Sequence, residues 1–161
     1  MALDSKPSGT PVANTGLVRP PLVYLSAIGL GLFVHWLWPV QLLPAFAAVP
    51  AGATLAMMGV ALFVSAVRTL RKAGTPVPGN RATTLIVRTG PYAFSRNPIY
   101  LAFTVFQLGV AAWLNSLALL LALLPALAVM ALVVIPREER YLAARFPSEY
   151  LPYRRKVRRW L

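Results

Sequence analysis

The stretch that decides the fold is residues 97–136, NPIYLAFTVFQLGVAAWLNSLALLLALLPALAVMALVVIP, which contains no charged residue. An apolar run of this length exceeds the roughly 20 residues that one helix needs to cross a bilayer. The polar pair Asn115 and Ser116 divides the run near its middle. We therefore expect two membrane helices, over about 99–114 and 117–135, joined by a tight turn.

A second uncharged interval lies between Arg19 and Arg68 and is also too long for a single membrane span. Prolines interrupt this interval, and we expect one helix over about 22–38 and another over about 51–67. With four expected spans, the chain is predicted to be an all-α integral membrane protein. The prolines that separate the first two helices are Pro39, Pro44 and Pro50.

The composition agrees with a bilayer environment. Hydrophobic residues make up 58% of the 161 residues and charged residues 12%, whereas soluble domains are nearer to about 45–50% and about 25%. The chain has no cysteine, which excludes disulfides, and its one histidine and four acidic residues lead us to expect no metal site. The net charge of +12 is compatible with nucleic acid, but the cations flank apolar runs. We therefore expect no nucleic-acid partner and interpret the cations as determinants of membrane orientation.

The cations gather in two polar segments, residues 68–97 and 137–161, whereas the short connections within each pair of helices carry none. Because positively charged loops stay in the cytoplasm, we expect the long loop and both termini on that side. Residues 1–18 are interpreted as a loose N-terminal tail rather than a cleavable signal, and residues 19–161 as one membrane domain. The basic residues 154–160 are expected to contact anionic lipid headgroups.

Two clusters of polar residues border the expected helices, and each has a structural and a functional interpretation. In residues 90–100, GPYAFSRNPIY, Asn97 can cap a helix that starts at Pro98. Capping alone does not explain why two tyrosines and an arginine accompany it at the membrane surface. Glu138 and Glu139 follow the last apolar helix and are either solvated charges or part of a pocket beside the basic loop, because acids near a membrane need partners.

Together these segments resemble the isoprenylcysteine carboxyl methyltransferase family and the broader group that includes the phospholipid N-methyltransferases. The resemblance rests on residues 90–100, on the helical hairpin after them, and on the segments EERYL (138–142) and FPSEY (146–150). It covers about residues 71–161, whereas the first two helices match only in hydropathy. It implies an S-adenosylmethionine-dependent methyltransferase that is embedded in the membrane, with the cytoplasmic loop and a helical C-terminal tail forming the cofactor site.

The resemblance also implies which residues bind the cofactor. They come from the loop before the motif, from the motif itself and from a glutamate after the last membrane helix. On this chain they are Thr84, Leu85, Ile86, Val87, Tyr92, Asn97, Pro98, Ile99, Tyr100 and Glu138. We add Arg96, because its guanidinium can pair with the methionine carboxylate of the cofactor or with a lipid phosphate. The rings of Tyr92 and Tyr100 can face adenine or the sulfonium cation, and Glu138 can accept hydrogen bonds from ribose or ammonium groups.

The chain departs from that family where the substrate would bind. The eukaryotic enzymes that methylate prenylcysteine look to have a histidine in place of Thr84 and an arginine in place of Val134. Arg137 lies on nearly the same helical face as Val134 and is therefore our candidate for the substrate contact. The cofactor match survives these changes better than the substrate match. Two further departures are Ala102 and Pro147, where the family usually has glycine.

The predicted reaction is methyl transfer to a lipophilic small molecule or a lipid-linked acceptor, with membrane lipid as the surrounding partner. Such a site mainly orients donor and acceptor and excludes water, so no catalytic base is assigned. Two alternatives stay open: a phospholipid amine N-methyltransferase, and a non-catalytic membrane protein whose basic segments bind anionic lipid or a partner. The acceptor atom and the oligomeric state also stay open.

Overall fold

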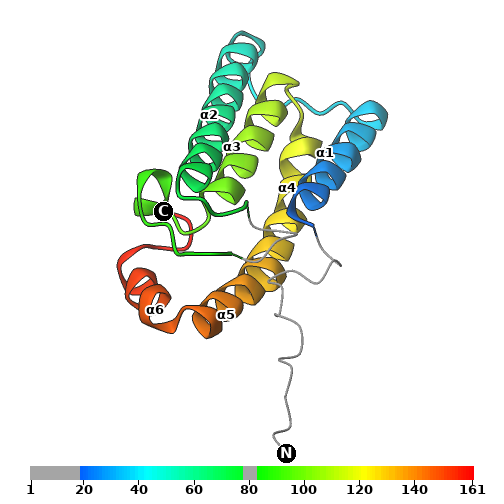
Figure 1. The fold of residues 1–161 in the computed structure, drawn as a ribbon. Helices are drawn as coiled ribbons and strands as arrows, with labels where there is room; N and C mark the ends of the chain where they lie inside the picture. Colours follow the sequence, from blue (N-terminus) through cyan, green and yellow to red (C-terminus); the bar gives the residue numbers. More distant parts are fainter. Residues whose placement is uncertain (1–18, 78–82) are drawn as a thin grey trace, which may run out of the picture.

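A computed structural model describes residues 19–77 and 83–161 of the chain. In this part of the chain all regular structure is helical and no strand occurs, which confirms the predicted all-α fold. The loose tail predicted over residues 1–18 lies outside the described residues. The α-helices, shown in Figure 1, are α1 (Pro20–Leu37), α2 (Ala45–Lys72), α3 (Pro98–Trp113), α4 (Leu117–Val129), α5 (Ile135–Arg145) and α6 (Pro147–Lys156).

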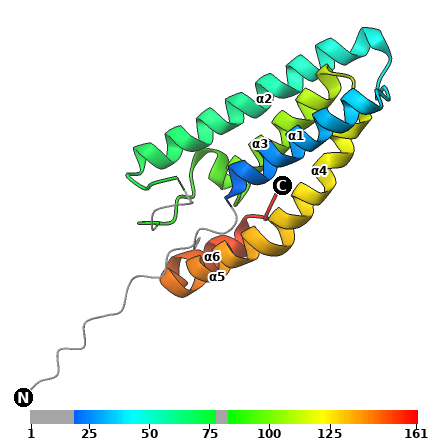
Figure 2. The same cartoon turned by 90° about the vertical axis from the view of Figure 1, so that its right-hand side faces the viewer.

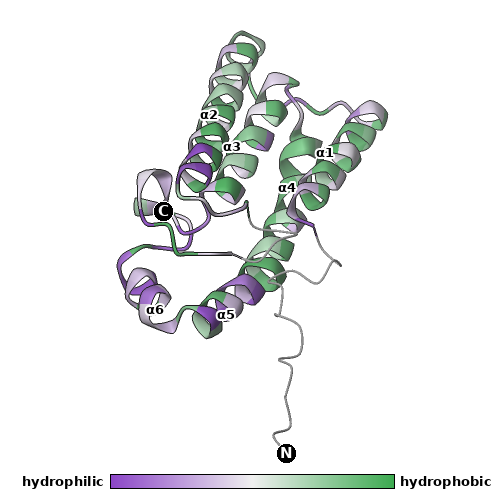
Figure 3. Ribbon diagram, in the orientation of Figure 1, coloured by the Kyte–Doolittle hydropathy of each residue, from purple (hydrophilic) through white to green (hydrophobic). Residues whose placement is uncertain are grey.

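Three helical segments within the described residues are long and apolar enough to cross a membrane. They are α1, α2 and the continuous rod Leu117–Arg145, which contains α4 and α5. Helix α3 is apolar but has only 16 residues, so the predicted count of four spans stays a prediction. Figure 3 shows that hydrophobic residues dominate α1 to α4, whereas hydrophilic residues gather on α5, on α6 and at the adjoining end of α2. The protein is therefore a membrane protein with one polar end.

Helix α2 is longer than the predicted span of residues 51–67, and the prediction that Pro50 interrupts it was wrong. Pro50 lies near the start of α2, where the missing N–H removes one backbone hydrogen bond and leaves the rest of the helix intact. At its other end α2 continues through Arg71 and Lys72, which sequence reasoning had placed in a non-helical loop. Cations in the last turn of a helix are stabilised by the partial negative charge of its free carbonyl groups.

The last apolar helix runs without a break into the polar tail. Between α4 and α5 the rod forms one π-helical turn, Met130–Val134, and the N–H of Ile135 donates to the carbonyl of Met130. This turn inserts one residue and so rotates the side chains of α5 relative to those of α4. The helix continues past Arg137 to Arg145, and α6 follows it with Pro152 inside, so the C-terminal tail is helical.

Small residues let the helices approach closely. Helix α2 packs against α3, and α1 packs against α4 (Figure 2). A Cβ atom added to Gly52 of α2 would lie 2.2 Å from the backbone nitrogen of Trp113. A Cβ atom added to Gly109 of α3 would lie 2.3 Å from the backbone nitrogen of Ala56. No side chain fits at either glycine, so contact between the two backbones holds α2 and α3 in register.

The predicted tight turn between α3 and α4 is present. Asn115 has φ 50°, a left-handed conformation that asparagine tolerates better than most residues. Its Oδ1 accepts hydrogen bonds from the N–H groups of Leu42 and Leu43, at 2.8 and 2.7 Å. Ser116 caps α4 by accepting from the N–H of Leu119 at 3.2 Å. The turn thus joins the α1–α2 connection to the α3–α4 connection.

Candidate functional site

The predicted motif and the tail meet at the polar end of the bundle. A 3₁₀ turn, Gly90–Ala93, and the start of α3 face α5 and α6 there. Two cavities of about 70 and 30 Å³ lie between these elements and share four lining residues: Tyr92, Arg96, Asn97 and Glu138. The larger cavity is also lined by Leu70, Thr83, Leu85, Ile86, Val87, Glu139, Leu142, Tyr150 and Tyr153, and the smaller one by Pro98, Ile99 and Tyr100.

A hydrogen bond joins the start of α3 to α5. The hydroxyl of Tyr100 donates to Oε2 of Glu138 at 3.0 Å, across 38 residues of sequence. Tyr100 is itself held by α1, because the hydroxyl of Tyr24 donates to its carbonyl at 3.2 Å. The Glu138 carboxylate accordingly has a defined position at the wall of both cavities, with one oxygen not engaged by Tyr100.

Glu139, the next residue, binds two arginines instead. Nη1 of Arg96 lies 3.0 Å from Oε1 of Glu139. Arg159 donates from Nε to Oε1 at 3.0 Å and from Nη2 to Oε2 at 2.8 Å, so the contact is bidentate. These hydrogen bonds from Arg159 to Glu139 raise the pKa of the guanidinium above its ordinary value. Glu139 is buried, with 8% of its surface exposed, and a buried carboxylate is stable only with such partners.

The C-terminal tail is part of the site, as the resemblance implied, but sequence reasoning missed which of its residues contact the motif. The backbone N–H of Arg96 donates to the carbonyl of Arg158 at 3.0 Å, and Nδ2 of Asn97 donates to the carbonyl of Arg159 at 2.9 Å. The hydroxyl of Tyr153 donates to the carbonyl of Tyr92 at 2.7 Å. The Arg159 side chain therefore binds protein, although we expected it to face lipid. Asn97 precedes α3 as predicted, but its side chain holds the tail and does not cap the helix.

Two buried polar atoms at the cavities have no hydrogen-bond partner among the described residues: the hydroxyl of Tyr92 and Nε of Arg96. Leaving a buried polar group unpaired costs about 1–3 kcal/mol, so such groups often mark the place of a ligand or water. Burial, and next the nearby Glu138, raise the pKa of Tyr92 above its ordinary value, so this hydroxyl stays neutral and can donate. The site thus offers two donors beside a carboxylate.

The structure brings most of the candidate residues together, and two lie apart. Thr84 is exposed and is absent from the lining of both cavities; its N–H donates to Oγ1 of Thr75 at 3.2 Å. Arg137 is exposed and also lines neither cavity. Val134 takes the position at which the eukaryotic prenylcysteine enzymes look to have an arginine. It is buried in the core with the rings of Tyr92 and Tyr100. The side chain of residue 134 therefore belongs to the core.

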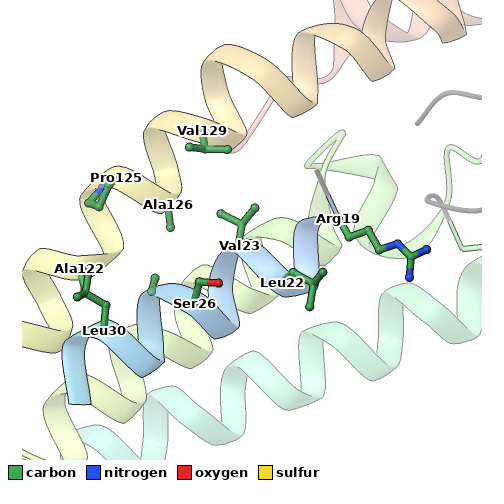
Figure 4. A pocket seen from close by; sticks show the side chains of 10 residues that line it. Arg19, Leu22, Val23, Ser26, Leu30, Ala122, Pro125, Ala126 and Val129 are labelled. Carbon is green, nitrogen blue, oxygen red and sulfur yellow. The ribbon is translucent and has the colours of Figure 1, made fainter. Parts of the chain in front are cut away.

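An apolar groove of about 390 Å³ lies between α1 and α4 and is separate from the two cavities (Figure 4). In Figure 4 the side chains of Val23 and Ser26 lie on the side of α1 that faces α4, and Ala126 and Val129 lie opposite them. The remaining lining residues are Arg19, Leu22, Ala27, Leu30, Ala122 and Pro125. In the described residues no group of three or more His, Cys, Asp or Glu side chains could hold a metal ion.

Comparison with known proteins supports the interpretation of the motif. The model of the phospholipid methyltransferase family matches residues 47–149. This chain is 37% identical to the cobalt-zinc-cadmium resistance protein CzcN of Cupriavidus metallidurans over 81 residues. The matched segment is half of this chain and covers 37% of the length of CzcN. The chain is also 36% identical over 63 residues, 39% of its own length, to the full length of an uncharacterised protein of Haemophilus influenzae. No solved structure matches the chain significantly.

Proposed function

The chain belongs to the phospholipid methyltransferase family of membrane methyltransferases, and from that premise we propose that it uses S-adenosylmethionine to methylate a lipophilic acceptor. One observation carries this proposal above all. The Tyr92 hydroxyl and Arg96 Nε, which have no partner among the residues that the structure describes, lie with Glu138 around the cavities at the polar end of an apolar bundle. A water-soluble, zwitterionic cofactor can reach this end from water while a lipid acceptor arrives from the bilayer.

The donor set fits the amino-acid part of the cofactor. Arg96 Nε can donate to its carboxylate, and the Glu138 carboxylate can accept from its ammonium or from a ribose hydroxyl. The two cavities, of about 70 and 30 Å³, are smaller than the whole cofactor. The adenosine part would therefore extend along the segment that contains Leu85 and Ile86, where Leu85 is exposed.

In this proposal the residues of the chain orient the cofactor and exclude water from the site. The cofactor, when bound, supplies an activated methyl group on a sulfonium sulfur. Tyr100 holds the Glu138 carboxylate still, and Glu139 with Tyr150 holds the Arg96 guanidinium still, so the polar contacts exist before the cofactor arrives. Buried apolar residues around Tyr92 and Tyr100 keep water from the methyl group. No residue is assigned as a general base.

We place the hydrophobic chain of the acceptor in the groove between α1 and α4. The groove is lined almost wholly by apolar side chains, and burial of an acyl or prenyl chain there is favourable without being selective. Selectivity would come from the polar end of the acceptor. A phospholipid amine is a second candidate acceptor: with Val134 in the core, no cation at that position stands ready for a carboxylate substrate.

The proposal is tested by calorimetry with the purified protein in lipid nanodiscs. Titrated S-adenosylmethionine should bind with one site per chain. A transfer assay with the labelled cofactor and a crude lipid extract should then deliver label to the organic phase. A protein that is folded but shows neither binding nor transfer would leave only the non-catalytic interpretation, in which the basic segments bind anionic lipid.

A further inference from the structure

We propose that Arg96, Glu139 and Arg159, here called the arginine–glutamate triad, form the subsite that recognises the carboxylate of an amino-acid ligand, and that tail residue Arg159 supplies its positive charge. This inference rests on the proposed function, because it concerns the same cofactor pocket. The starting observation is that one carboxylate lies between two guanidinium groups, with nitrogen–oxygen distances of 2.8–3.0 Å. The triad therefore carries one net positive charge.

That charge borders the cavities. Arg96 lines both cavities and Glu139 lines the larger one. The side chains of Arg96 and Glu139 are each 10% exposed, so water screens their charges weakly. Without Arg159 the triad would be a neutral pair, and the attraction for an anionic ligand group would fall. Arg159 thus acts through Glu139, as a positioning residue outside the cavity lining.

The free hydrogen-bonding capacity points the same way. Nη1 of Arg96 is engaged by Glu139 and by the hydroxyl of Tyr150, at 3.0 and 3.1 Å. Nε of the same guanidinium is buried and has no partner among the described residues. The guanidinium is fixed on one edge and has a donor left for a carboxylate oxygen.

The other carboxylate of the pocket completes a match to a zwitterion. Glu138 and Glu139 are consecutive on α5, so their side chains leave the helix about 100° apart, given 3.6 residues per turn. Glu138 binds Tyr100 of α3, whereas Glu139 binds the tail. A ligand with an ammonium and a carboxylate can place the ammonium at Glu138 and the carboxylate at the triad.

The experiment compares two ligands that differ in the amino-acid part. S-adenosylhomocysteine carries the amino acid, whereas methylthioadenosine has the same adenosine and sulfur without it. Calorimetry on Arg159→Gln should show about tenfold weaker binding of S-adenosylhomocysteine, because the triad loses its net positive charge beside a weakly screened site, and unchanged binding of methylthioadenosine. Arg158→Gln is the matched control: it removes the same charge one residue away, where the side chain is exposed and only the backbone carbonyl is used.

Arg159→Lys keeps the positive charge but loses the bidentate contact with Glu139. It should show a smaller loss of affinity, again confined to S-adenosylhomocysteine. This variant carries the test if Arg159→Gln does not fold. Equal weakening of both ligands would show that the triad is only a structural clamp and would overturn the inference while the proposed function stands. If the unaltered protein binds neither ligand, the proposed function falls as well.

Discussion

Glu138 and Glu139 are adjacent on α5 but bind different partners. Sequence reasoning favoured Glu138 and left Glu139 as its companion, but the two side chains bind different parts of the molecule. Glu138 faces the tyrosine at the start of α3 and borders both cavities. Glu139 is the acid that holds the tail, through a pairing with Arg159 across 20 residues.

At Glu138 we predict that substitution by alanine weakens S-adenosylmethionine binding by about tenfold to a hundredfold, since one charge-assisted hydrogen bond contributes about 1.5–3 kcal/mol. Glu149→Ala is the control, because Glu149 is exposed on α6 and lines neither cavity. Calorimetry on both purified variants measures the difference. Equal affinities in the two folded proteins would refute the role given to Glu138.

At residue 134 we predict that a farnesylated cysteine analogue is a poor methyl acceptor compared with phosphatidylethanolamine. Val134 is buried and Arg137 is exposed away from the cavities, so neither offsets the desolvation of a carboxylate. A methyl-transfer assay with the labelled cofactor compares the two acceptors. Efficient turnover of the farnesyl analogue that Arg137→Ala abolishes and Arg140→Ala leaves intact would contradict this prediction.

At the scale of elements, the helices pair through contacts of different kinds. Helices α2 and α3 meet backbone to backbone at small residues, whereas α1 and α4 touch closely at Gly31 and leave an apolar groove beside that contact. The close pair carries the motif at the start of α3. The open pair offers room for a lipid chain.

For the close pair we predict that Gly52→Val lowers the thermal unfolding temperature, because its side chain would overlap the backbone of Trp113. Overpacking of this kind costs about 1–3 kcal/mol. Gly29→Val is the control, since nothing lies within 4 Å of a Cβ atom added there. Thermal unfolding in detergent, followed by circular dichroism, measures both variants; equal unfolding temperatures would show that α2 and α3 are not packed this closely.

For the open pair we predict that Ser26→Trp raises the KM for a long-chain acceptor several-fold and leaves S-adenosylmethionine affinity unchanged. The indole would fill the groove, which shares no lining residue with the cofactor cavities. Leu25→Trp is the control, because Leu25 is exposed and lies outside the groove lining. An unchanged KM in Ser26→Trp would show that the acceptor does not bind in the groove.

At the scale of the whole molecule, polar chemistry lies at one end of an apolar bundle (Figure 3). The last turns of α2, the 3₁₀ turn, α5 and α6 all gather there. The two short connections, α1–α2 and α3–α4, carry no charge and are joined by Asn115 at the opposite end. Because positively charged loops stay in the cytoplasm, this separation of charge predicts that the site faces the cytoplasm.

The orientation is tested by labelling single cysteines, since the native chain has none. We predict that Ala93→Cys and Ser148→Cys are labelled from the cytoplasmic side and that Leu114→Cys is labelled from the other side. All three positions are exposed, so accessibility to the reagent depends on the membrane. Labelling of residue 114 from the same side as the other two would contradict the predicted topology.

The sequence by itself determined the helical membrane class and the place of the motif. Long uncharged runs permit only helices that satisfy their own backbone hydrogen bonds in lipid, and the turn at Asn115 followed from the only two consecutive polar residues in 99–135. Local rules were less accurate at Pro50, which was expected to separate the first two helices and lies inside α2. Packing of α2 against α3, which no local rule contains, outweighs one lost hydrogen bond.

Only the tertiary structure decided which charges pair. The arginine–glutamate triad joins Arg96, Glu139 and Arg159, three residues separated by 43 and 20 positions, and nothing periodic in the sequence relates them. Sequence reasoning assigned Arg159 to lipid because it belongs to a basic run, and a run of like charges does not show which member turns inward. The free energy of burying Glu139 makes that choice, because a buried carboxylate is stable only where the folded chain brings cations to it.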